Sequence, residues 1–310
     1  MATTVTAPVS NSLAAAKEYV PLLDEAYAAA SKSAILDTVP ERVRWPEFKQ
    51  ADTVYLYTLT TVGMGDYSRD GGYVPGNTTG TWNSYQLTTD RGRSYSVDVL
   101  DNDFSKDLAV ENLLGNVERQ HIVKEIDAYR FAAYATGAAS ANKVSATISS
   151  SADAIAAIDT ATEVLDNAEV PYEDRILFVN PSMYKLIKGG ITRFTENRDR
   201  NIDYNVEIYN DMRIITVPKP RFNTSITLAQ PSSNSDAGGY TLSGNAINFM
   251  IIHPSSVMQV MRHYNPRVFA PSQNTQAESW LVQPRFCHGA WVLHEKTNGI
   301  YVHSGTTVSG

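Results

Sequence analysis

The sequence has few of the groups from which common active sites are built. It has one cysteine, Cys287, which excludes an intramolecular disulfide and a thiolate-rich zinc site. It contains no phosphate loop ending in Gly-Lys and no Gly-x-Ser-x-Gly motif around a nucleophilic serine. Its histidines are scattered without the spacing of metal ligands. We therefore expect a protein that is not an enzyme, with no catalytic residue, no cofactor and no metal.

Charge and long apolar runs are also scarce. Charged residues make up 19% of the 310 residues, and the formal net charge is −7, which argues against a nucleic-acid-binding surface rich in lysine and arginine. No apolar run approaches the roughly 20 residues needed to span a membrane. The N-terminus has no basic region followed by an apolar core, so no secretory signal is expected. We expect a cytoplasmic chain with one large or two medium domains.

What the sequence does have is a long hairpin pattern between residues 53 and 100. The run from Thr53 to Val62 is β-branched and aromatic, which is typical of a strand. A glycine-rich tip follows, and the returning strand alternates apolar and polar residues from Tyr85 to Val99. Such a hairpin has no core of its own, so we expect it to be buried by the rest of the chain or by a neighbouring copy. The candidate inter-subunit contacts are Tyr67, Arg69, Asp70, Tyr73 and Trp82.

A long helical pattern follows from about Phe104 to Thr136. Asp101-Asn102-Asp103 is predicted to cap it. One apolar stripe contains Val117, and a second stripe, rotated about the axis, contains Ile122, Ile126 and Tyr129. Because the stripes differ in direction, we expect the helix to contact different partners at its two ends. These four residues are the candidate contacts of the helix, and the alternative is a long core helix in a large domain.

The remaining pattern predicts an inserted α/β domain and a return to the first domain. Residues 152–169, 175–180 and 181–190 read as helix, strand and helix, and residues 206–217 read as a strand pair turning at Asn210-Asp211. The strand 247–252 closes this region near residue 255. Strands over 257–269, 280–293 and 300–303, the last two joined by a turn at 296–299, are expected to pair with the early strands.

Three short motifs resemble known sites but fail on inspection. Gly63-Met64-Gly65 lacks the third glycine and the helix of a dinucleotide site. The loop from Asp66 resembles the start of a calcium site, but has Asn77 where a bidentate glutamate is needed. His294-Glu295 lacks the second histidine of a zinc protease. Adjacent Cys287 and His288 point to opposite faces of a strand, so packing roles are expected for both.

The order of these parts resembles the major capsid proteins of tailed bacteriophages, which have the Hong Kong 97-like fold. Three stretches of the C-terminal block are similar to capsid proteins from phages of Gram-positive bacteria: Phe249-Met-Ile-Ile-His-Pro-Ser-Ser-Val-Met-Gln-Val, Pro266-Arg-Val-Phe-Ala-Pro, and Trp291-Val-Leu-His-Glu-Lys-Thr-Asn-Gly-Ile-Tyr-Val-His. Arg175-Ile-Leu-Phe-Val-Asn-Pro-Ser-Met-Tyr and Asn210-Asp-Met-Arg-Ile-Ile-Thr-Val-Pro resemble the axial domain of that family. The match covers most of residues 35–303.

The resemblance implies an α+β fold with five parts. They are an N-terminal arm over 1–34, an extended loop over about 53–100, a spine helix over about 104–136, a peripheral domain over 35–144 and 256–310, and an axial domain over 145–255. It implies self-assembly as pentamers and hexamers into an icosahedral virion shell that encloses double-stranded DNA without sequence-specific binding, assembled in the host cytoplasm. The implied partners are other copies, a portal protein, a scaffolding protein and a decoration protein, with no membrane.

Two departures from the family concern covalent crosslinking and the scaffolding domain. Some relatives crosslink a loop lysine to an asparagine of a neighbour, but no lysine lies between Lys49 and Lys106 here. The arm before Ala34 is also too short for a fused scaffolding domain, so the scaffold is expected to be a separate protein.

Two alternative functions stay open. They are an encapsulin-like compartment shell of the same fold, and an α+β enzyme whose site forms only in the folded chain.

Overall fold

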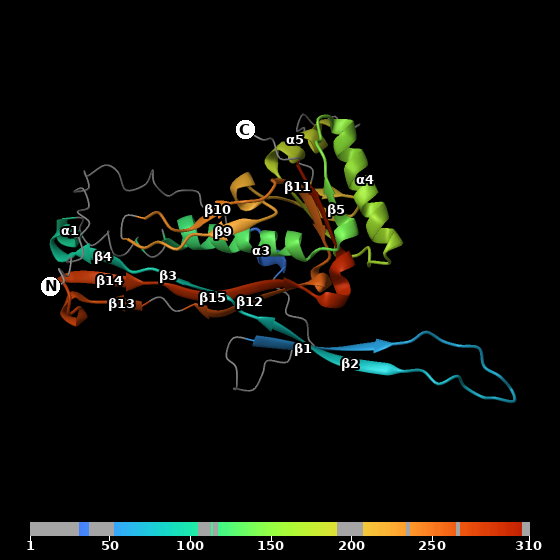
Figure 1. Cartoon of the computed structure of the whole chain (residues 1–310). Coiled ribbons are helices and arrows are strands. Elements are labelled where there is room, and N and C mark those ends of the chain that lie inside the picture. The colour runs from blue at the N-terminus through green and yellow to red at the C-terminus, as the bar shows by residue number, and fades with distance from the viewer. Residues whose placement is uncertain are drawn as a thin grey trace, which may run out of the picture.

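The computed structural model describes residues 31–36, 53–104, 113, 117–190, 207–233, 236–264 and 267–305. It shows an α+β chain with three visible parts: a long ribbon of strands with a helix along one side, a compact sheet with two helices, and a hairpin that extends away from both (Figure 1). Most of the predicted N-terminal arm lies outside the described residues. The part inside them includes a short 3-10 helix, η1 (Ala34–Leu36).

The compact unit is built on a sheet that has six strands among the described residues. Their order is β5 (Lys143–Ser145), β16 (Ile300–Ser304), β11 (Ile247–Ile252), β6 (Ile176–Val179), β8 (Met212–Thr216) and β7 (Ile208–Tyr209). The pairs β16–β5 and β6–β8 are parallel, and the others are antiparallel. Helices α4 (Ser151–Asn167) and α5 (Pro181–Gly190) pack on one face. All four residues of β6 are buried because both faces of the sheet are covered.

The predicted helices, strand and turn of this unit are present, and local contacts explain where they begin. Ser150 accepts a hydrogen bond from the Asp153 amide and forms a capping box at the start of α4. Pro181 opens α5, where the missing N–H costs nothing. Asn210 and Asp211 turn between β7 and β8 with φ values of 46° and 57°, a region that Asn and Asp tolerate better than most residues.

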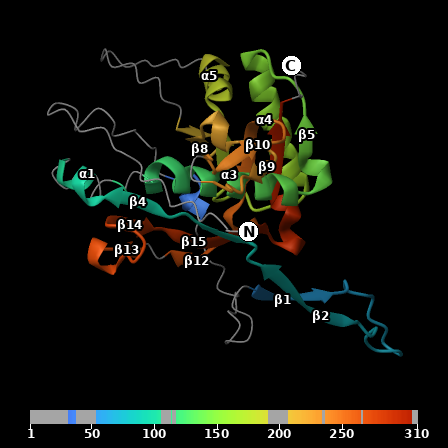
Figure 2. The ribbon, with the colours of Figure 1, turned by 60° about the vertical axis from the view of Figure 1, so that its left-hand side comes forward.

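The ribbon consists of two three-stranded antiparallel sheets placed end to end (Figures 1 and 2). The first has the order β12 (Val257–Tyr264), β15 (Arg285–Val292), β3 (Thr89–Gly92), and the second has the order β13 (Arg267–Phe269), β14 (Ser279–Gln283), β4 (Tyr95–Asp98). The predicted pairing of late strands with early ones is therefore confirmed for these elements. A separate pair, β9 (Ile226–Leu228) and β10 (Tyr240–Leu242), lies near the middle of the ribbon.

The hairpin is shorter than the sequence predicted. Its strands are β1 (Thr53–Thr61) and β2 (Thr78–Gln86), which pair from Thr53↔Gln86 to Thr61↔Thr78. The alternating residues after Leu87, which were expected to continue the returning strand, form β3 and β4 instead. Alternation predicts a strand with one buried face but does not say which strand it pairs with, and here the partners are β15 and β14.

The last strand also pairs differently from the prediction. The segment η7 (His294–Gly299) is a 3-10 turn rather than a hairpin turn, and it directs β16 into the six-stranded sheet. The C-terminal strands were expected to return to the early strands as a group. β16, at 300–304, instead lies between β11 and β5. The C-terminal strands are therefore divided, with β12 to β15 in the ribbon and β16 in the compact sheet.

The predicted helix over 104–136 differs at its start. Helix α1 covers Val99–Phe104, so Asp101 to Asp103 lie inside a helix rather than capping one. Asp98 instead accepts a hydrogen bond from the Leu100 amide at 2.9 Å, because it is the residue just before the first turn. Most of residues 105–116 lie outside the described part of the chain. A π-helical turn, η2 (Glu118–Ile122), then leads into α3 (Val123–Gly137), which ends within one residue of the predicted end.

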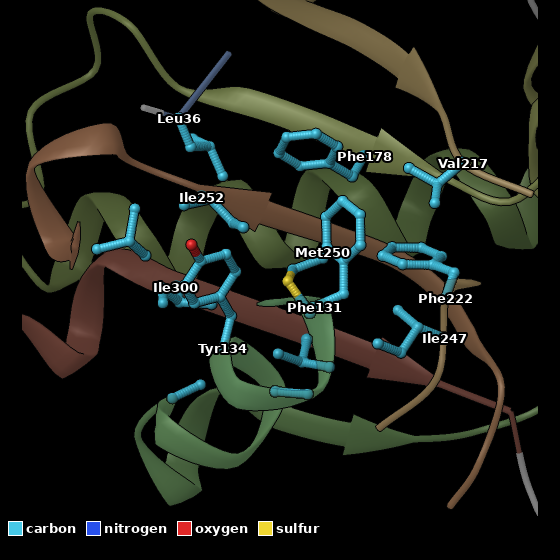
Figure 3. Packing of buried hydrophobic residues seen from close by; sticks show 14 of the residues in the cluster. Leu36, Phe131, Tyr134, Phe178, Val217, Phe222, Ile247, Met250, Ile252 and Ile300 are labelled. Carbon is cyan, nitrogen blue, oxygen red and sulfur yellow. The ribbon is translucent and has the colours of Figure 1, made fainter. Parts of the chain in front are cut away.

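The main core lies where α3 crosses beneath the six-stranded sheet (Figure 3). Phe131 of α3 packs edge-on against Phe178 of β6 and Phe222, with ring centroids 5.2 and 5.1 Å apart. Leu36 from η1 is fully buried in the same cluster. The cluster also contains Tyr134, Val217, Ile247, Met250, Ile252 and Ile300. This core joins the ribbon helix to the compact unit, and it leaves the hairpin outside.

Candidate assembly surface

The base of the hairpin is anchored to the ribbon. Val54 and Leu56 are buried against Met258 and Val260 of β12. Tyr85 packs on Trp291 with ring centroids 5.9 Å apart. These residues form a small apolar cluster, which fixes the direction in which the hairpin leaves the body.

Beyond this base the hairpin exposes an unusual amount of apolar surface. Among the described residues, eight of the fifteen exposed large hydrophobic side chains lie between residues 57 and 82. They are Tyr57, Leu59, Val62, Met64, Tyr67, Tyr73, Val74 and Trp82. The hairpin extends away from the rest of the chain in both views, so nothing in the described monomer covers them (Figures 1 and 2). A concentrated apolar surface of this kind is typical of an interaction site.

The two faces of the distal hairpin differ. Tyr57 lies directly opposite Trp82, and their rings are 5.1 Å apart. Leu59, two residues along and therefore on the same face, lies opposite Gly80, where any Cβ would collide with the Tyr57 ring. The other face carries threonines, with Thr58 opposite Thr81. We call the first the aromatic face, defined by Tyr57, Leu59 and Trp82.

The tip of the hairpin is closed by its own contacts. Ser68 and Gly72 exchange two backbone hydrogen bonds of 3.2 and 2.8 Å, and Gly72 has a φ of 76°, which suits glycine. The rings of Tyr67 and Tyr73 meet edge to face at 4.9 Å. The predicted tip residues are therefore together and exposed. Arg69, at the centre of the turn, carries its charge into solvent.

The candidate helix residues are placed differently. Val117, Ile122 and Ile126 are 5 to 7% exposed and form one cluster with Phe286 of β15. The rotated stripes expected from the sequence meet in one cluster because the π-helical turn η2 adds a residue per turn between Val117 and Ile122. These three side chains are thus core residues of the monomer and offer little surface to a partner.

Tyr129, the fourth helix candidate, is half-buried against the ribbon. Its ring meets that of His288 edge to face at 4.9 Å. His288 is fully buried, and neither of its ring nitrogens has a hydrogen-bond partner in the described part of the chain. Burial, reinforced by nearby Arg130 and Arg91, lowers the pKa of His288 to about 4. The packing role expected for this histidine agrees with its position.

Sequence reasoning missed a buried charge cluster on α3. Asp127 is fully buried, and its carboxylate accepts hydrogen bonds from the Ser31 hydroxyl at 2.6 Å and the Ser33 hydroxyl at 2.7 Å. It also pairs with Arg221 of the 3-10 turn η4 (Lys219–Arg221) at 3.2 Å. Glu125, on the same helix, pairs with Arg91 at 2.8 Å.

These charges fasten the start of the described chain, β3 and η4 to one helix. Charged residues in a helix normally indicate a solvent face, so the sequence carried no signal that these were buried. The partners are also far from α3 along the chain, and only the fold brings them within reach.

The described part of the chain offers little for two other kinds of site. Within the described ranges, no group of three or more His, Cys, Asp or Glu side chains could hold a metal ion. Among the described helices, none is both long and apolar enough to cross a membrane.

The fold was compared with known proteins. No protein-family model matches the sequence, and no curated protein matches it. Solved structures do match over most of the chain. The mature capsid of bacteriophage PhiM1 matches with a TM-score of 0.61 and 14% identity, covering 83% of each chain. A structure from Mycobacterium phage Bobi has a TM-score of 0.59 and 13% identity, covering 94% of this chain and 96% of the other.

The capsid of cyanophage P-SCSP1u agrees with these, at a TM-score of 0.59 and 14% identity over 83% and 84% of the two chains. The chain has the fold of phage capsid proteins. The expected fold is thereby confirmed in its general form, and the match to a phage of Mycobacterium fits the expected likeness to phages of Gram-positive hosts. At sequence identities this low, the structural similarity establishes the fold alone.

Proposed function

We propose that this chain is the major capsid protein of a phage and assembles as pentamers and hexamers into an icosahedral shell around double-stranded DNA. The observation that carries the proposal is the capsid-type fold combined with a hairpin that exposes eight large hydrophobic side chains. Exposed apolar surface of this extent needs a partner, and a second copy of the chain supplies one at every position in a closed shell.

In this proposal the hairpin is the extended loop of the fold, and its aromatic face and tip contact a neighbouring subunit. Tyr67, Arg69, Asp70, Tyr73 and Trp82 remain the candidate contacts, and each is exposed. The α3 residues act instead within the subunit, by holding the ribbon, the compact unit and the segment 31–36 together.

The proposed domains follow the same scheme, with one change. The ribbon and α3 make the peripheral domain, and residues 145–255 make the axial domain, to which β16 adds a strand. A separate scaffolding protein, a portal protein and a decoration protein are the proposed partners besides other copies of the chain. The product is a component of the virion, assembled in the host cytoplasm.

The deciding experiment is the solution mass of the purified protein by light scattering, followed by negative-stain imaging, with and without a co-expressed scaffold candidate. Capsomer rings, tubes or closed shells are the expected result. A stable monomer or dimer under every condition would contradict the proposal. Nuclease-protected DNA inside shells made during infection would distinguish a virion from a compartment that holds a protein cargo.

A further inference from the structure

The hairpin of β9 and β10 departs from the compact unit and returns to it. β8 and β11 both belong to the six-stranded sheet, and β9 and β10 lie between them along the chain without joining that sheet. β9 instead contacts α3, and Figure 1 shows the hairpin beside that helix. We call the described residues of 224–242, which are 224–233 and 236–242, the strap. The strap connects the compact unit with the ribbon helix.

The strap has no apolar anchor of its own. None of its residues belongs to an apolar cluster formed by the described part of the chain. Leu242 is 48% exposed, and each of the two strands has three residues. A two-stranded hairpin of this size is at best marginally stable by itself. Contacts with other elements must therefore hold the strap in place.

Arg91 of β3 fastens the strap to both the ribbon and α3. Its Nη1 donates to the backbone oxygen of Ala229 at 2.8 Å, and its Nη2 donates to that of Gly239 at 3.1 Å. Its Nε donates to the Glu125 carboxylate of α3 at 2.8 Å. The Arg91 and Glu125 side chains are 16% and 8% exposed, and hydrogen bonds shielded from water are stronger than exposed ones. One guanidinium therefore joins three elements.

Arg93 makes a second connection, just beyond the end of β3. Its Nη2 donates to the backbone oxygen of Asp236 at 2.8 Å, and its Nη1 donates to that of Ala237 at 3.4 Å. The strap atoms in these four arginine contacts are all backbone oxygens. The contacts therefore depend on the backbone conformation of the strap, and a change in that conformation would break several of them together.

Two glycines give the strap the conformation that the arginines bind. Gly238 and Gly239 have φ values of 64° and 77°, in the left-handed region that favours glycine. A Cβ at Gly238 would lie 2.9 Å from Nη1 of Arg93, whereas a Cβ at Gly239 would meet nothing within 4 Å. The glycine pair turns the chain at the point where the oxygens of Ala237 and Gly239 accept from the two arginines.

The root of the strap is attached at a different point on α3. Phe222, just before the strap, is fully buried in the main core, where its ring packs edge-on against Phe131 of α3. The Arg91 contact is at Glu125, in the first turn of α3. Six residues separate Glu125 from Phe131, or about 9 Å at roughly 1.5 Å per residue. One attachment would leave a pivot, and two separated attachments fix an orientation.

We propose that the strap is a releasable tie that fixes the orientation of the compact unit on the ribbon, with Arg91 and Arg93 as its fastening. Because the fastening is polar and joins no apolar cluster, the strap opens locally without unfolding a core. An open strap leaves the attachment at the main core as a pivot. One consequence rests on the proposed function: a closed strap gives every free subunit the same shape for assembly.

The test is hydrogen exchange over the strap in the full chain, followed by mass spectrometry. Arg91→Gln with Arg93→Gln is expected to speed exchange by about tenfold or more, because each hydrogen bond to a charged donor contributes roughly that factor. Gly239→Ala should also speed it, since the added Cβ has space and only the backbone is strained. Arg285→Gln is the matched control and keeps wild-type exchange, because Arg285 pairs with Asp90 instead.

A conservative variant separates geometry from charge. Arg91→Lys keeps the charge but loses the planar fork that reaches Ala229, Gly239 and Glu125 together, so its strap should exchange as fast as that of Arg91→Gln. Wild-type exchange in the double variant or in Arg91→Lys would overturn the fastening.

Two further readouts keep the outcomes distinct. Exchange over β11 should stay at the wild-type rate in every variant, and an equal acceleration there would overturn the tie by showing that the arginines support the whole fold. If the unchanged chain forms no shells, the capsid function fails, while the exchange over the strap still decides the tie.

Discussion

Apolar side chains are usually buried and charged ones exposed, and the hairpin and helix α3 depart from this rule in opposite ways. The hairpin leaves aromatic and aliphatic side chains in solvent, and α3 buries Glu125, Asp127 and Arg130. The buried charges are compensated within the chain, by Arg91, Arg221 and the segment 31–33. No residue in the described ranges covers the exposed apolar groups of the hairpin. The difference separates a helix whose unusual residues are satisfied inside the described monomer from a hairpin whose unusual residues, in the proposed function, contact a neighbouring copy.

The sharpest way to break this comparison is to remove the buried carboxylate of α3. Asp127→Ala leaves Arg221 buried without its ion pair and the Ser31 and Ser33 hydroxyls without their acceptor. The expected loss is about 3–5 kcal/mol of unfolding free energy. Urea denaturation followed by circular dichroism measures it. Asp103→Ala, an exposed carboxylate of α1, is the control and should change stability by less than about 0.5 kcal/mol.

Equal stability of these two variants would show that α3 is not fastened by its buried charge. A loss of unfolding free energy in Asp127→Ala alone would show that α3 is held by its contacts with the segment 31–33 and η4, because these supply the partners of Asp127.

The second prediction concerns acid, through His288 under α3. Its pKa is about 4 in the folded chain, below the ordinary histidine value of 6.5, so the unfolded chain binds the proton more readily between these values. Stability should therefore fall as the pH drops from 6.5 to 4, and this residue accounts for about 3 kcal/mol of the loss. The whole effect is absent above pH 6.5, where the imidazole is neutral in both states.

The measurement is unfolding free energy against pH for wild type and His288→Phe, which keeps an aromatic ring beside Phe286 and Tyr129. Between pH 6.5 and 4, the unfolding free energy of this variant should fall less steeply than that of the wild type. His294→Phe, at an exposed position, should keep the slope. An unchanged slope in His288→Phe would mean that the histidine is hydrated in solution.

The third prediction addresses the aromatic face of the hairpin. Trp82→Ala should leave the free subunit nearly as stable as wild type, because the indole is exposed, and should weaken subunit association by about 2 kcal/mol, or roughly thirtyfold. Thr81→Ala, the next residue and on the opposite face, is the control. Light scattering across a concentration series reports both. Equal effects at these two positions would show that the face does not select the partner.

The smallest effect is expected at the tip. Tyr67→Ala removes the ring pair with Tyr73 and should destabilise the closed turn by about 0.5–1 kcal/mol, with little effect on global unfolding. Hydrogen exchange at the Gly72 amide, which donates to Ser68, should become several times faster. Arg69→Ala should leave that exchange rate unchanged. Slow exchange in both variants would mean that the backbone hydrogen bonds alone hold the tip.

The compact unit and the hairpin strands could be predicted because their signals are local. The proline that opens α5 and the Asn210-Asp211 turn act within a few residues. The candidate tip residues were also placed correctly on an exposed turn, because a glycine-rich connection between strands has no core.

The pairing of the strands after the hairpin could not be predicted, and neither could the destination of β16. A period of two shows that one face is buried, but it is the same for a strand paired with β2 and one paired with β15. The joining of two helical stripes through η2 was also missed, because a π-helical turn changes the angle between residues without a sequence marker.

The sequence by itself determined the element types, the exposed glycine-rich tip and the scarcity of catalytic groups, since each depends on neighbouring residues or on composition. Only the tertiary structure decided that Asp127 and Glu125 are buried and that Val117, Ile122 and Ile126 face the chain's own core. The physical reason is distance along the chain: the partners of Asp127 lie more than 90 residues away, and only a folded chain brings them into contact.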